Sequence, residues 1–237
     1  MTDERVFCTY VQVLFKREIR APSSAQARRN EILEAALRVV ADGGPDAITF
    51  RRVADRAKVP LGSLTYYFES REDLLREAFR LYLSEATRFL SDLESEKRPH
   101  TAAGVIELVL EVARREFADD PALVRVEYEL ILYAARDPEL ARAFNSYERW
   151  IEARLAADLE SLGAPRPIDA ARTIIDLARG FEIERLTHPG AQLEDLERRL
   201  GLVIDALINE RPDRVGSGRK RPARRRRESN QNRRSAP

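Results

Sequence analysis

The chain has 237 residues, enough for a small domain and a larger one, and its single cysteine, Cys8, excludes an internal disulfide and a cysteine-based metal cluster. Because it is rich in Ala, Leu, Glu and Arg and has no apolar run near the roughly 20 residues of a membrane span, we expect an all-helical protein of the reducing cytoplasm. Its net charge is +1, but the charge is unevenly distributed. Residues 211–237 have eleven Lys or Arg and two acids, a net charge of +9, and the rest of the chain has 30 basic and 38 acidic residues, a net charge of −8. The acidic remainder argues against a nucleic-acid-binding surface over the whole protein.

Residues 1–24 carry an apolar, β-prone stretch, Val6 to Phe15, without the cationic region or cleavage site of a signal peptide. The stretch could be an ordered arm or the product of an upstream start codon, and we expect a poorly ordered extension. A first helix is predicted from Ala27 to Ala41, because apolar residues recur there at helical spacing and Gly43-Gly44-Pro45 follows.

Two short helices with a tight turn between them are predicted next. Thr49 can cap the first, which runs to Ala57, and Pro60 suits the entrance of the second, from Leu61 to Phe68. Two short helices joined in this way form a helix-turn-helix, whose second helix enters the major groove of DNA. The turn residue is Lys58, and a left-handed backbone there costs roughly 1–2 kcal/mol, so the turn either differs from the usual form or is strained.

A long helix is predicted to follow, because Ser70-Arg-Glu-Asp73 resembles a capping box and leads into a run of apolar residues that reaches Tyr82. The ordered set of motifs from Arg28 to Tyr82 resembles the DNA-binding domain of the TetR family of bacterial transcriptional regulators. It comprises RRNEILEAALRVVADGG, Ile48-Thr49-Phe50, Val53-Ala54-x-x-Ala57, VPLGSLTYYF and SREDLL. Beyond Tyr82 the resemblance is a layout of helices only.

The resemblance implies a helix-turn-helix domain over residues 25–82 and a helical effector-binding and dimerisation domain over 83–210. Lys58 replaces the usual Gly, and Thr65 and Tyr66 stand where the family more often has Tyr and His. Hydrogen bonds to phosphate are expected from Thr49, Ser63, Thr65, Tyr67 and Arg71. Arg51 is the best candidate for a base or phosphate contact. The predicted DNA-binding residues are Thr49, Arg51, Arg52, Leu61, Gly62, Ser63, Thr65, Tyr66, Tyr67 and Arg71.

After a break at residues 97–100, four more helices are predicted over 101–117, 121–135, 138–162 and 167–186, with prolines near three of their entrances. In the TetR family the corresponding helices enclose a cavity for a small-molecule effector, although each bulky residue could equally belong to an ordinary core. The predicted effector-binding residues are Val112, Tyr128, Tyr133, Phe144, Trp150 and Phe181. Glu127 and Glu129 could line a cavity for a cationic or polar ligand, or they could be surface charge.

The last predicted helix carries a heptad seam with spacings of three and four residues. With one face of the preceding helix, this seam predicts a four-helix interface between two chains, as in TetR-family dimers. Ile204 and Ile208 widen the stripe, so it could also pack within its own chain. The predicted dimer residues are Ile174, Phe181, Leu193, Leu196, Leu200, Val203 and Leu207.

Residues 211–237 have one lone valine and dense positive charge, which predicts a disordered basic tail. It either adds sequence-independent attraction to phosphates or has no specific role. With one cysteine and two isolated histidines, His100 and His188, we expect no enzyme, cofactor or metal site. The sequence therefore predicts a homodimeric, effector-responsive regulator of a palindromic operator, most simply a repressor; the alternative is a basic-tailed, sequence-tolerant nucleic-acid-binding protein.

Overall fold

The computed structural model describes residues 24–96, 99–119, 121–188 and 190–209, and within these ranges every regular element is a helix. The elements are α2 Ser24–Gly43, the 3₁₀ turn η1 Pro45–Ala47, α3 Phe50–Ala57, α4 Leu61–Tyr67, α5 Arg71–Glu96, α6 Ala102–Asp119, α7 Pro121–Ala134, α8 Pro138–Ser161, α9 Pro167–Thr187 and α10 Leu193–Ile208. The all-helical prediction is confirmed. None of the described helices has the length and apolar composition of a membrane-spanning segment.

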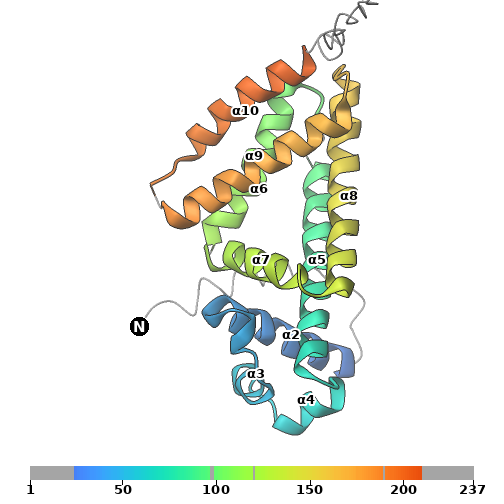
Figure 1. Cartoon of the computed structure of the whole chain (residues 1–237), viewed down its shortest axis with the longest axis vertical. Coiled ribbons are helices and arrows are strands. Elements are labelled where there is room, and N and C mark those ends of the chain that lie inside the picture. The colour runs from blue at the N-terminus through green and yellow to red at the C-terminus, as the bar shows by residue number, and fades with distance from the viewer. Residues whose placement is uncertain (1–23, 97–98, 120, 189, 210–237) are drawn as a thin grey trace, which may run out of the picture.

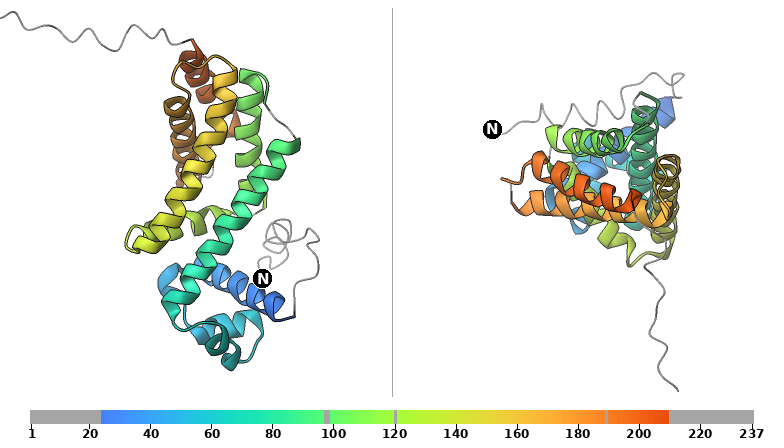
Figure 2. Two further views of the ribbon diagram at one scale, coloured as in Figure 1. Left: turned by 90° about the vertical axis from the view of Figure 1, so that its right-hand side faces the viewer. Right: turned by 90° about the horizontal axis from the view of Figure 1, so that it is seen from above.

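The molecule is elongated, with α3 and α4 at one end and α10 at the other (Figure 1). Helix α5 runs from the α3–α4 end far into the rest of the molecule, beside α8, which the side view also shows (Figure 2). Its 26 residues give it a length of about 39 Å. The predicted N-terminal extension, apart from Ser24 at the start of α2, and the predicted basic tail lie outside the described residues.

Buried side chains form two hydrophobic cores. The first core is built by α2 to α5, and it also contains Val126, Leu130 and Ala134 of α7 and Leu140 of α8. The second core joins α6, α8, α9 and α10, with Phe181 and Leu200 among its buried residues. The division between the cores therefore does not coincide with the expected domain boundary after residue 82, because α7 contributes to the first core from much later in the chain.

Local capping explains where the helices begin. The Thr49 hydroxyl accepts a hydrogen bond from the N–H of Arg52 at 3.1 Å, as predicted for an N-cap. At the start of α5 the Ser70 hydroxyl accepts from the N–H of Asp73 at 3.0 Å, and the Asp73 carboxylate accepts from the N–H of Glu69 at 3.1 Å. These reciprocal bonds fix the entrance of α5 directly after the helix-turn-helix.

Candidate DNA-binding surface and ligand cavity

The turn between α3 and α4 is set by Lys58, whose backbone lies in the left-handed region at φ 55° and ψ 43°. Its N–H bonds to carbonyls at the end of α3, and the N–H of Val59 donates to the Ala54 carbonyl at 3.0 Å. The sequence left two alternatives, a different turn or a strained one. The turn keeps the usual left-handed geometry, so Lys58 carries the strain. This closure presents α4 at the tip of the molecule (Figure 1).

Helix α4 buries one face and exposes the other. Leu64 and, just beyond the helix, Phe68 pack into the first core. On the opposite side Tyr66 is 81% exposed, and at the start of the helix Leu61 is 50% exposed, although both are large hydrophobic side chains. A Cβ placed at Gly62 would meet nothing within 4 Å, so the protein's own packing does not require a glycine there. An exposed apolar and aromatic face of this kind is typical of a contact surface.

The cations around this face differ in how they are held. Arg51 is exposed and has no ion-pair or hydrogen-bond partner in the described part of the chain, so its guanidinium is available to a ligand. Arg52 is also exposed, one residue further along α3. Arg56, on the next turn, pairs with Asp42 of α2 at 2.8 Å.

Three residues predicted to contact phosphate have internal roles. Arg71 donates to the carbonyls of Ile48 at 3.0 Å and Pro45 at 2.8 Å, which ties the turn before α3 to the start of α5. Tyr67 is half-buried against the first core, and the Thr49 hydroxyl is occupied as a helix cap. The remaining predicted residues Ser63 and Thr65 lie on α4, where the Thr65 hydroxyl donates to the Gly62 carbonyl at 3.1 Å.

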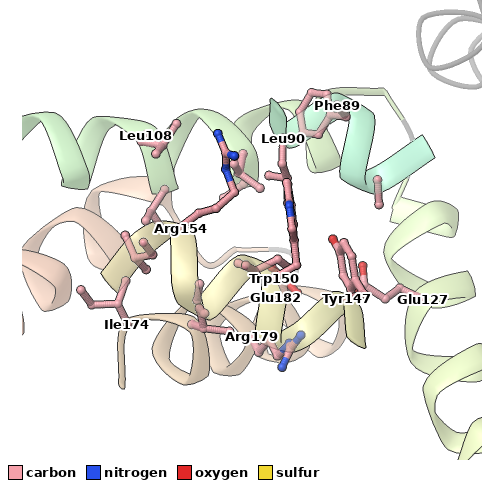
Figure 3. Close-up of a pocket in the computed structure, with 18 of the residues that line it drawn as sticks. Phe89, Leu90, Leu108, Glu127, Tyr147, Trp150, Arg154, Ile174, Arg179 and Glu182 are labelled. Carbon is pink, nitrogen blue, oxygen red and sulfur yellow. The ribbon is translucent and has the colours of Figure 1, made fainter. Parts of the chain in front are cut away.

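A cavity of about 160 Å³ lies between α5, α6, α7, α8 and α9. Most of its wall is apolar, with Phe89 of α5 and Trp150 of α8 as the largest wholly apolar side chains (Figure 3). Tyr147 and Trp150 stack with ring centroids 6.4 Å apart and planes 17° apart. The Arg154 guanidinium lies 5.2 Å from the centroid of the Trp150 ring, a cation–π distance.

Several charged groups line the same cavity. Glu127 accepts a hydrogen bond from the Tyr82 hydroxyl at 2.6 Å, and burial raises the pKa of the Glu127 carboxyl. Arg154 pairs with Glu94, and Arg179 pairs with Glu148 of α8.

Glu182, also in the wall, accepts a hydrogen bond from the Tyr128 hydroxyl at 2.7 Å. Burial and the neighbouring Glu182 carboxylate raise the pKa of Tyr128, so its phenol stays protonated. The Tyr128 hydroxyl oxygen also lies 3.2 Å from the Arg179 carbonyl oxygen, so its one proton is shared between two acceptors on α9 and joins α7 to that helix.

The cavity uses only part of the residue set predicted for an effector. Val112 and Trp150 line it, whereas Tyr128, Tyr133, Phe144 and Phe181 are outside its lining. Tyr133 and Phe144 pack against the first core instead, and Phe181 is 1% exposed inside the second. Lining residues that the sequence prediction missed include Tyr82, Phe89, Tyr147, Arg154 and Arg179. Glu127, which the sequence offered as a possible lining group, does line the cavity, three residues after Val124 on α7.

The predicted dimer seam is divided in the structure. Its residues Ile174, Phe181, Leu196 and Leu200 are at most 1% exposed within their own chain, because α9 and α10 use them to build the second core. Leu193, Val203 and Leu207 are half-buried. The outer faces instead expose Ile183 of α9, at 49%, and Leu202 of α10, at 72%.

Comparison with known proteins covers both parts of the chain. Residues 32–78 match bacterial regulatory proteins of the tetR family, and residues 100–210 match the tetracyclin repressor-like C-terminal domain. The transcriptional repressor KstR of Mycobacterium tuberculosis is 27% identical over 207 residues, which are 84% of this chain and 89% of KstR. The nicotine-responsive transcriptional repressor HdnoR of Paenarthrobacter nicotinovorans is 22% identical over 80% of this chain and 96% of its own.

Among solved structures, the multidrug binding protein EbrR in complex with ethidium superposes with a TM-score of 0.59 at 28% identity, covering 74% of this chain and 98% of EbrR. The first match covers the helix-turn-helix, and the second covers the cavity-lining helices α6 to α9. The family consists of DNA-binding regulators rather than enzymes. This chain therefore belongs to the TetR family of helix-turn-helix transcriptional repressors.

Proposed function

We propose that the protein works as a homodimer in the cytoplasm, binds a palindromic operator, and leaves it when a small molecule enters the cavity. Each α4 would occupy a major groove, with the two half-sites roughly 34–36 Å apart or a multiple of that distance. Arg51, Arg52 and the exposed face of α4 would contact DNA. The main support for this proposal is the position of α7. Its Glu127 lines the cavity, while its Val126 and Leu130 pack into the core of the DNA-binding end.

Two sets of contacts support coupling between cavity and DNA-binding end. Tyr82 of α5 bonds to Glu127 of α7 inside the cavity, and α5 begins directly after the helix-turn-helix. Lower on α5, Arg76 donates to Asp137 at 2.8 Å, and Asp137 also caps α8. A ligand that binds one arrangement of α5 and α7 more tightly than another would change the spacing of the two recognition helices.

The dimer would form through the outer faces of α9 and α10. Ile183 and Leu202 are large, exposed and apolar, and such residues on adjacent helices suit a four-helix interface. The seam residues buried in the second core would support this surface from within. The proposed interface therefore uses the same two helices as the sequence prediction, through their outer faces.

Two relatives support an aromatic small molecule as the effector class. HdnoR is nicotine-responsive, and EbrR was solved with ethidium. In the present chain the paired rings of Tyr147 and Trp150 provide the flat surface on which an aromatic ligand can lie.

A gel-shift titration with the DNA upstream of the gene tests the function. Arg51→Ala and Tyr66→Ala should each weaken binding by about 1–3 kcal/mol if they contact the operator. Arg149→Ala, on α8, removes the same charge at an exposed site outside the proposed DNA-binding and dimer surfaces and should leave affinity unchanged. Equal effects of Arg51→Ala and Arg149→Ala would contradict the proposed surface.

The net charge of +9 over residues 211–237 supports a second candidate, a sequence-tolerant nucleic-acid-binding protein. The same titration separates the two functions. A repressor gives a discrete footprint on its own upstream DNA, whereas the second candidate binds any DNA of equal length with equal affinity.

A further inference from the structure

The cavity wall combines aromatic surface with a carboxylate, Glu127, that forms no ion pair within 4.0 Å in the described part of the chain. Its charged lining consists of three carboxylates, Glu94, Glu127 and Glu182, and two guanidinium groups, Arg154 and Arg179. The wall therefore has an excess of one acid when all five groups are ionised.

Both guanidinium groups already have carboxylate partners. Arg154 pairs with Glu94 in the wall, and Arg179 pairs with Glu148 just outside it. An anionic ligand would have to displace one of these carboxylates, and it would also meet Glu127. The arrangement of existing pairs thus disfavours an anion.

Glu127 is held differently. It accepts a hydrogen bond from the neutral Tyr82 hydroxyl and forms no ion pair within 4.0 Å in the described part of the chain. Burial raises the pKa of its carboxyl, because the surrounding protein disfavours a negative charge there. A bound cation would stabilise that negative charge. Glu127 projects from α7 toward the side of the cavity where Tyr147 lies (Figure 3).

The aromatic rings favour the same class of ligand. Trp150 and Tyr147 stack on each other, and Arg154 rests over the Trp150 ring, which shows that a cation is accommodated against this wall. A volume of about 160 Å³ is small beside the roughly 300–1,000 Å³ of drug-sized sites. The cavity therefore fits a compact ligand.

We propose that the cavity binds a small organic monocation, a protonated amine or quaternary ammonium with an aromatic or apolar body, whose charge lies against the Glu127 carboxylate. The aromatic body would lie against Trp150 and Tyr147. This inference rests on the proposed function only in taking the cavity as the effector site.

The single tryptophan of the chain, Trp150, lies in the cavity wall, so its fluorescence reports on cavity occupancy. We would titrate the full-length protein with three probes that share a phenyl ring: benzyltrimethylammonium, benzyl alcohol and phenylacetate. The cation should bind most tightly to the wild type and phenylacetate least. Benzyltrimethylammonium that fails to bind at millimolar concentration, or phenylacetate that binds more tightly, would overturn the inference.

Two variants assign the effect to one carboxylate. Glu127→Gln keeps the shape and removes the charge, and it should weaken binding of the cation about tenfold or more while leaving benzyl alcohol unchanged. Glu129→Gln is the matched control, because Glu129 is on the same helix and outside the cavity wall. Equal affinity of both variants for the cation would overturn the role of Glu127, and thermal melting checks that both are folded.

The outcome is separable from that of the proposed function. A wild-type footprint on upstream DNA together with no preference for the cation would refute the ligand class alone. Binding of the cation that depends on Glu127, without any footprint, would support the ligand class and refute the operator-binding proposal.

Discussion

At the scale of single residues, Lys58 carries backbone strain at the turn that presents α4. Its φ of 55° costs roughly 1–2 kcal/mol for a residue with a Cβ, and the structure retains it because the turn must close. Lys58→Gly should therefore raise the free energy of unfolding by about 0.5–1 kcal/mol, since the greater freedom of glycine in the unfolded chain offsets part of the relief.

Thermal and chemical denaturation of the full-length protein measure this change. Lys58→Ala is the control, because it removes the charge and keeps the Cβ that causes the strain. If Lys58→Gly and Lys58→Ala change the free energy of unfolding equally, the change comes from the lost charge of Lys58 and not from its backbone conformation.

Arg71 has a second residue-scale consequence, because its guanidinium holds two backbone carbonyls that join the turn before α3 to α5. Arg71→Ala should lower the free energy of unfolding by about 1–3 kcal/mol, since the Ile48 and Pro45 carbonyls lose a charged donor. Arg51→Ala should leave stability unchanged, as Arg51 is exposed and makes no such bond. Denaturation curves of both variants decide between a structural role for Arg71 and the phosphate contact predicted from its sequence position.

At the scale of elements, α10 separates inward from outward apolar residues. Leu200 is fully buried and Leu202 is 72% exposed. Leu202→Glu should give monomers with an intact thermal transition, because it places a charge on the proposed dimer surface and leaves the core untouched. Leu200→Glu should instead destabilise the second core.

Light scattering together with thermal melting tests this prediction. Leu132→Glu, on α7, changes another exposed leucine, at 67%, and should leave the oligomeric state as in the wild type. If the Leu202→Glu protein remains dimeric, this face of α10 is not the dimer interface.

The elements show what the sequence could and could not predict. Helical periodicity and capping chemistry placed the helices, and the ordered motifs from Arg28 to Tyr82 identified the helix-turn-helix. Periodicity reports that a face is buried, yet it does not report which neighbour buries it. For this reason Leu196 and Leu200 looked like an interchain seam, and Tyr133 and Phe144 looked like cavity residues, although all four pack within the chain.

The missed lining residues have a related cause. The sequence gives no sign of Arg154 and Arg179 as lining residues, because their carboxylate partners are distant in sequence and on other helices. Only the crossing of five helices brings them into one wall. The sequence offered Glu127, beside Tyr128, as a possible lining group, but it could not separate this role from surface charge.

At the scale of the whole molecule, residues 211–237 reverse the charge balance. A chain that ends at Glu210 changes from a net charge of +1 to −8. We expect weaker binding to specific and non-specific DNA alike, and each lost phosphate contact should reduce the slope of log affinity against log salt by about 0.9. The footprint should keep its centre, since the helix-turn-helix sets the register.

Affinities of both chains at several salt concentrations provide the measurement. Identical slopes would show that these residues do not contact phosphate. Loss of the footprint would show that they contribute to sequence recognition, contrary to the proposed function.

Helix α7 has a consequence for how the molecule unfolds. It gives Val126 and Leu130 to the first core, and through the Tyr128 hydroxyl it bonds to α9, which belongs to the second. A helix shared in this way links the two cores energetically, so we expect the two cores to unfold together. Occupancy of the cavity should then slow amide hydrogen exchange in α3 and α4, although no atom of either helix lines the cavity.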